Sequence, residues 1–102
     1  MTVKNIPRKI KVGDRWYSVE VVEAMEDKYA MGEVVFDKAL INLKRKNTIG
    51  KPYKQAEMRE TFWHELVHAI LVDMGEYKLN SKEAFVEQFA IRLSRAIQSA
   101  RF

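Results

Sequence analysis

The chain has 102 residues, of which 47% are hydrophobic and 31% charged, and this length and composition predict one globular domain over residues 1–102. It contains no cysteine, which excludes disulfides and thiolate metal ligands, and it has no apolar run of signal-peptide or membrane-span length, so we expect a cytoplasmic protein without membrane contact. The 18 basic and 14 acidic residues give a net charge of +4, which is too balanced to indicate a dedicated nucleic-acid-binding protein.

The first segment with a regular pattern follows Pro7. Residues 1–9 are expected to form a flexible arm, because Pro7 prevents the residues before it from continuing a helix. Apolar and polar residues then alternate from Ile10 to Val22 around Gly13-Asp14, which predicts a hairpin of two strands with its turn at that pair. The candidate core residues of this hairpin are Ile10, Val12, Trp16, Val19 and Val21.

A second hairpin is expected between residues 32 and 43. Asp37-Lys38 would form its turn, and Val34, Phe36 and Leu40 are among its apolar residues. Residues 23–30 before it fit either a connection or one helical turn. The two hairpins together predict an antiparallel β-meander.

Lysines and one arginine surround the loop that follows, between Lys44 and Lys54. A solvated loop is the simplest interpretation of this basic cluster. The alternative is a binding surface for an acidic substrate or a nucleic acid, which would show a steep salt dependence.

The pattern becomes helical at about Gln55, and this helix contains the motif His64-Glu65-Leu66-Val67-His68. Histidines four residues apart lie on one face of a helix, so both imidazoles can bind one metal ion, with Glu65 beside it as a general base. The segment 62–72 is apolar on nearly every face, as expected of a helix packed on two sides. The three polar side chains are therefore expected to be buried or in a cleft, where a divalent cation would offset the cost of burying them.

Asp73-Met74-Gly75 is expected to end this helix, since glycine is common just beyond a helix C-terminus. Glu76 to Leu79 would form a short link, and Asn80 or Ser81 could cap a last helix that runs to about Arg101. So short a link predicts two roughly antiparallel helices. The buried stripe expected on the last helix comprises Val86, Phe89, Ala90, Leu93, Ile97 and Ala100. The whole is predicted to be α+β, a β-meander followed by two packed helices, the first of which carries the motif.

A catalytic zinc site usually has three protein ligands, and the chain contains no third histidine. Glu83 and Glu87 on the last helix are the available carboxylates. Glu83 lies nearer the centre of the apolar stripe, whereas Glu87 would lie more nearly level with His68 if the helices were strictly antiparallel. Residue spacing leaves both open as the third ligand.

The segment Thr61 to His68, preceded by a strand and followed by Glu83 and the Phe89-Ala90 pair, resembles the gluzincin-type metallopeptidases of the ImmA/IrrE class. Small phage and prophage proteins of that class are the most similar, and the resemblance covers roughly residues 30–98. It implies a minimal zincin-like fold, a Zn²⁺ ion held by His64, His68 and Glu83, and Glu87 near the site.

The function expected from these features is zinc-dependent hydrolysis of peptide bonds in a protein or peptide substrate, by metal-activated water with Glu65 as general base. An exposed strand edge within residues 32–43 could hold the extended substrate, and Tyr29, Tyr53 or Tyr77 could assist as an oxyanion donor. The alternative is a non-catalytic, zinc-stabilised interaction module of phage or prophage type, because a small domain often needs a structural metal.

Overall fold

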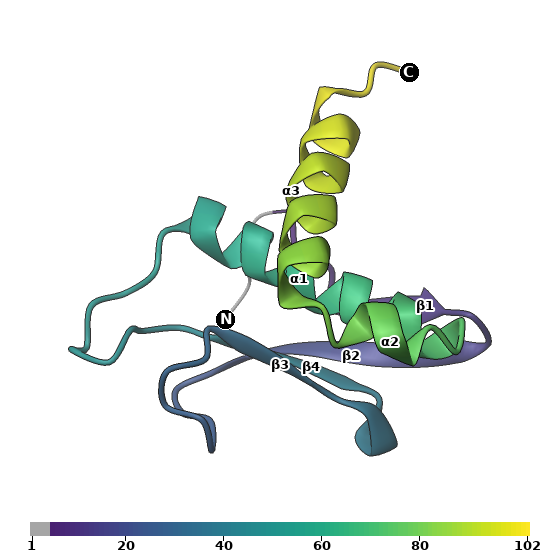
Figure 1. Ribbon diagram of the computed structural model, residues 1–102. Coiled ribbons are helices and arrows are strands. Elements are labelled where there is room, and N and C mark those ends of the chain that lie inside the picture. The colour runs from purple at the N-terminus through teal and green to yellow at the C-terminus, as the bar shows by residue number, and fades with distance from the viewer. Residues whose placement is uncertain (1–4) are drawn as a thin grey trace.

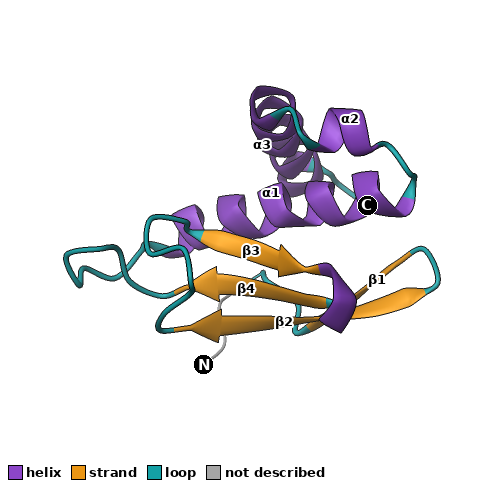
Figure 2. Ribbon diagram, turned by 60° about the horizontal axis from the view of Figure 1, so that its bottom comes forward, coloured by secondary structure: helices purple, strands orange, loops and turns teal. Residues whose placement is uncertain are grey.

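The computed structural model describes residues 5–102 and has an α+β fold, as predicted. A four-stranded sheet lies on one side of α1, and α3 crosses the other side of α1, so α1 is the middle layer (Figures 1 and 2). The elements in chain order are β1 (Lys9–Val12), β2 (Arg15–Val22), β3 (Gly32–Val35), a 3₁₀ turn (Phe36–Lys38), β4 (Leu40–Lys44), α1 (Gln55–Asp73), α2 (Tyr77–Asn80) and α3 (Glu83–Ser99).

Both predicted hairpins are confirmed, but the antiparallel meander is wrong. The strand order is β1-β2-β4-β3, and β4 pairs with β2 in parallel, with Val19 opposite Ile41 and Val21 opposite Leu43. Ile41 and Leu43 are fully buried, whereas all four residues of β3 are only half-buried. The more apolar strand therefore occupies the centre, and the connection 23–31 carries the chain past it to the edge of the sheet.

The N-terminal part of the sheet also differs from expectation. Residues 1–4 of the expected arm lie outside the described residues, but Lys9 already belongs to β1, Ile6 packs against the core, and the Arg8 carbonyl accepts a hydrogen bond from the Val19 N–H. Trp16, predicted to be in the core, is 56% exposed, and its neighbour Tyr17 is buried instead. Side chains alternate along a strand, so Tyr17 shares the inner face with Val19 while Trp16 faces outward.

Helix α1 is packed on two sides, as its apolar sequence predicts. Its face toward the sheet contributes Met58, Phe62, Leu66 and Ala69 to a core with Val12, Tyr17, Ile41 and Leu43. Its opposite face packs Val67 and Leu71 against Val86 and Ala90 of α3. The polar residues between these two faces lie along one edge of the helix, where they line a cleft.

The connection between the long helices corrects three expectations. Helix α1 ends at Asp73 with Gly75 at φ +76°, as predicted, but the next segment forms the short helix α2 instead of a link. The residue before α3 is Lys82, so neither Asn80 nor Ser81 caps that helix. Helix α3 crosses α1 steeply in both views and is not antiparallel to it (Figures 1 and 2).

The predicted stripe on α3 is only partly buried. Val86 and Ala90 are buried where α3 meets α1, but Phe89, which lies between them in the sequence, is 49% exposed and stacks on Phe85. Ile97 is 54% exposed where the helix continues beyond its contact with α1 (Figure 1). Within residues 5–102, no helix combines the length and the apolar character needed to cross a membrane.

Candidate metal centre

Two elements bring three possible metal ligands to one point. His64 and His68 lie one turn apart on α1, with their Nε2 atoms 3.2 Å from each other. Glu83, in the first turn of α3, places one carboxylate oxygen 3.0 Å from His64 Nε2 and the other 3.0 Å from His68 Nε2. One possible ligand atom from each of the three residues lies within 4.8 Å of the other two. The steep crossing of the helices produces this arrangement, because it presents the start of α3 to the middle of α1.

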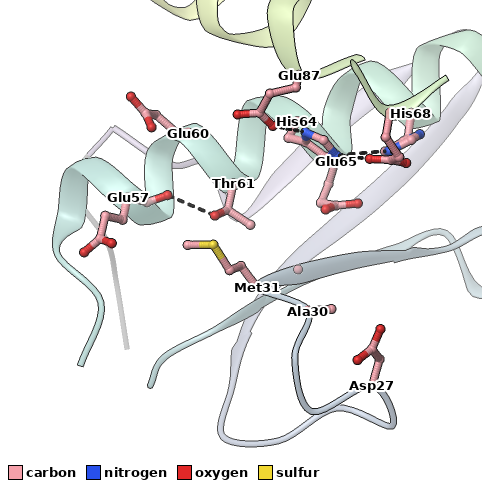
Figure 3. Close-up of a pocket in the computed structure, with 12 residues that line it drawn as sticks. Asp27, Ala30, Met31, Glu57, Glu60, Thr61, His64, Glu65, His68 and Glu87 are labelled. Atoms are coloured by element: carbon pink, nitrogen blue, oxygen red, sulfur yellow. Dashed lines mark hydrogen bonds and ion pairs between the residues drawn. The ribbon is translucent and has the colours of Figure 1, made fainter. Parts of the chain in front are cut away.

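A second set of contacts fixes the orientation of both imidazoles, and the contact of His64 with Glu87 is visible in Figure 3. The His64 Nδ1–H donates to Glu87 Oε2 at 2.9 Å, and the His68 Nδ1–H donates to Asn80 Oδ1 at 2.7 Å. Glu87 thus contacts the far nitrogen of His64, and it is Glu83 that faces both Nε2 atoms. Acceptors on the far ring nitrogens are the usual partners of metal-binding histidines, because they select the tautomer with a free Nε2.

These contacts leave several hydrogen-bond acceptors facing one another with no donor among them. When both Nδ1 atoms carry the proton, the Nε2 lone pairs of His64 and His68 face each other and the two oxygens of Glu83. Four electron-rich atoms this close repel one another unless a cation or extra protons lie among them. Two nitrogens at the usual Zn–N distance and a tetrahedral angle would be about 3.3 Å apart, which agrees with the observed 3.2 Å. The donor set therefore fits a divalent cation.

Glu65 lies next to these donors but takes part in none of their contacts. The residue is 8% exposed, its side chain points into the cleft (Figure 3), and it makes no side-chain hydrogen bond with any residue between 5 and 102. Burial raises the pKa of the Glu65 carboxyl above its usual value, and the nearby imidazoles oppose that rise. A buried carboxyl with a raised pKa and no partner is suited to accepting and donating a proton.

The cleft in front of Glu65 has a volume of about 520 Å³. Ala30, Met31 and Gly32 form one wall, and the exposed edge of α1 forms the other. Strand β3 lies at the edge of the sheet, and its first residue, Gly32, lines the cleft. A Cβ on Gly32 would lie 2.6 Å from Thr61 Cγ2 and 3.1 Å from Glu65 Cγ, so only glycine lets β3 approach α1 this closely.

Sequence reasoning missed two residues of this site and proposed others that lie elsewhere. Asn80 was expected to cap a helix, and neither its spacing nor its flanking residues indicate the contact with His68. Gly32 begins a predicted strand, and a glycine at such a point is a signal for close backbone approach. Of the residues that line the cleft, none is Tyr29, Tyr53 or Tyr77, so the expected oxyanion tyrosine is not found among the described residues.

No protein-family model, curated protein or solved structure matches this chain. What the site can do therefore follows from its own geometry.

Proposed function

We propose that the protein is a zinc-dependent metallopeptidase. The observation that carries this proposal is the convergence of His64, His68 and Glu83 on one point, beside a buried and unpartnered Glu65 at the edge of β3. Two histidines and a glutamate are the ligand set of several catalytic zinc sites and leave one coordination position open. A purely structural site would usually have four protein ligands and would gain nothing from a nearby unpaired carboxyl.

The residues divide the chemistry between them. A bound Zn²⁺ ion would lower the pKa of a water molecule and polarise the scissile carbonyl. Glu65 takes a proton from the attacking water and later gives it to the leaving amine, which balances the proton over the whole hydrolysis. Asn80 and Glu87 hold the imidazoles in the tautomers that leave Nε2 free.

Substrate binding is assigned to the outer edge of β3. An extended peptide can pair with the outward-facing backbone groups of β3 and continue past Gly32 into the cleft in front of Glu65. Such backbone pairing would place a peptide bond, rather than a side chain, in front of the general base. This placement favours peptide hydrolysis over other reactions of activated water.

A non-catalytic interaction module remains the second candidate, and one observation favours it. The metal ligands come from α1 and α3, so a bound ion would clamp the two helices of a small domain whose α3 is partly exposed. This function would need His64, His68 and Glu83 but not Glu65.

The two candidates are separated by zinc-reconstituted protein and its Glu65→Gln variant, incubated with a proteome-derived peptide library. The peptidase should contain one equivalent of zinc in both forms, and only the wild type should generate new peptide termini. Zinc binding without cleavage by either form would support the interaction module. Failure to retain stoichiometric zinc would refute both candidates.

A further inference from the structure

The walls of the cleft carry an unusual charge for this chain. Six of the fourteen acidic residues line it, and none of the eighteen basic residues does so among residues 5–102, although the chain as a whole has a net charge of +4. A divalent cation would offset only two of these six charges. The acidic residues are Asp27, Glu57, Glu60, Glu65, Glu83 and Glu87.

Three of these acids have no part in the proposed chemistry. Asp27 lies on the connection 23–31 below the metal centre, and Glu57 and Glu60 lie on the first two turns of α1 (Figure 3). None of the three forms an ion pair with a lysine or arginine in the described part of the chain. Asp27 accepts a hydrogen bond from the Tyr29 N–H and Glu57 accepts one from the Lys54 N–H, whereas Glu60 has no hydrogen-bond partner within residues 5–102. Glu60 is also exposed, so its carboxylate is free to meet a ligand.

A second observation shows that the acidic wall belongs to a binding cleft. Glu65 is 8% exposed, its carboxylate has no hydrogen-bond partner among the described residues, and its side chain points into the same space (Figure 3). Its carboxylate can therefore be satisfied only by water or a ligand in the cleft. The edge strand β3 begins at Gly32 in the wall of that space, so backbone pairing and charge recognition are available to one extended ligand.

We infer that the substrate is a cationic peptide, with lysine or arginine on the side of the scissile bond that lies over the first two turns of α1. This inference rests on the proposed function and specifies its substrate class. Glu60 is one helical turn from His64, about 6 Å along α1, and an extended peptide advances about 3.3 Å per residue. The basic side chain therefore falls about two residues from the scissile bond. Glu60 attracts it, and because this charge is exposed the preference is sensitive to salt.

The test uses a positional peptide library in which lysine, glutamine or glutamate occupies each position in turn. Cleavage is measured with the zinc-loaded wild type, and binding is measured by fluorescence anisotropy with the zinc-loaded Glu65→Gln variant. Lysine should be preferred over glutamine about two positions from the cut, on one side only, and Glu60→Gln should reduce that preference about 2- to 5-fold. Glu60→Lys should reverse it in favour of glutamate. The matched control Glu20→Gln, an exposed acid on β2 that does not line the cleft, should leave it unchanged.

The outcomes separate this inference from the proposed function. Cleavage without a preference for lysine, or a preference that Glu60→Gln and Glu60→Lys do not alter, would overturn the cationic substrate and leave the peptidase standing. No cleavage together with lysine-selective binding that depends on Glu60 would overturn the peptidase and support a cationic peptide as the ligand. The absence of both cleavage and binding would overturn both.

Discussion

Removal of the carboxylate charge of Glu83 is expected to abolish zinc binding, whereas the same change at Glu87 should only weaken it. Glu83 places an oxygen 3.0 Å from the Nε2 atom of each histidine and is the only charged member of the donor set, while Glu87 contacts the far nitrogen of His64. A partner on the far nitrogen of a ligating histidine is worth about 10–100-fold in metal affinity. Loss of a direct ligand should exceed that range.

These affinities convert to stability through linkage. Zinc at about 100 times its dissociation constant should stabilise the wild type by about 2.7 kcal/mol. For a domain of this size, that is a rise in Tm of about 10–20 °C. A 10-fold weaker Glu87→Gln variant should retain about 1.4 kcal/mol at the same zinc concentration, and Glu83→Gln should retain almost none.

The assay is thermal unfolding with and without zinc, combined with competition against a chelator of known affinity. Glu76→Gln, an exposed acid outside the cleft, serves as the matched control and should behave as the wild type. A large loss of affinity in Glu87→Gln with none in Glu83→Gln would show that the ligand assignment is wrong. Equal behaviour of all three variants would show that these residues do not hold zinc.

Three further predictions concern the surroundings of the site. Asn80→Ala should lower zinc affinity about 10-fold, because it removes the acceptor that orients His68, and a chelator competition that finds no change would contradict that role. Gly32→Ala should destabilise the protein by about 1–3 kcal/mol in urea unfolding, because its Cβ would lie 2.6 Å from Thr61 Cγ2; unchanged stability would mean that the strand and helix are not so close. In the metal-free protein, burial raises the folded-state pKa of Glu65 above 4.5, so the folded state binds more protons than the unfolded state, and stability should fall as pH rises from 4.5 through the raised pKa. The Glu65→Gln variant lacks this ionisation, so it should lose that part of the pH dependence. At neutral pH it should be more stable than the wild type by about 1 kcal/mol. Parallel profiles of stability against pH for the two metal-free proteins would contradict the burial of the charge.

Local patterns predicted the helices better than the sheet. The apolar run of α1 marks its two-sided packing, and Gly75 marks its end, because both are properties of a single segment. The place of β4 between β2 and β3 depends instead on which strand can bury more apolar surface. The pattern of each hairpin by itself does not compare one strand with another in this way. Trp16 shows a related failure, since its size suggests burial but the alternation with Tyr17 decides which face it takes.

The candidate site divides in the same way. His64, Glu65 and His68 are visible in the sequence because one helix sets their spacing. The choice of Glu83 over Glu87 depends on the angle at which α3 crosses α1, and that angle results from the packing of Val86 against α1 rather than from any local pattern. The contact between Asn80 and His68 likewise depends on the packing of α2 against α1 and not on a local sequence pattern.

The most direct test of the proposed function compares the wild type and Glu65→Gln at equal zinc occupancy, with cleavage of the best peptide from the library as the measured rate. A positioned general base contributes about 10²–10⁴-fold, so the variant should bind zinc and fold normally but lose at least about 99% of the rate. A Glu65→Gln protein that cleaves the same peptide as fast as the wild type would contradict the assignment of Glu65 and the metallopeptidase built on it.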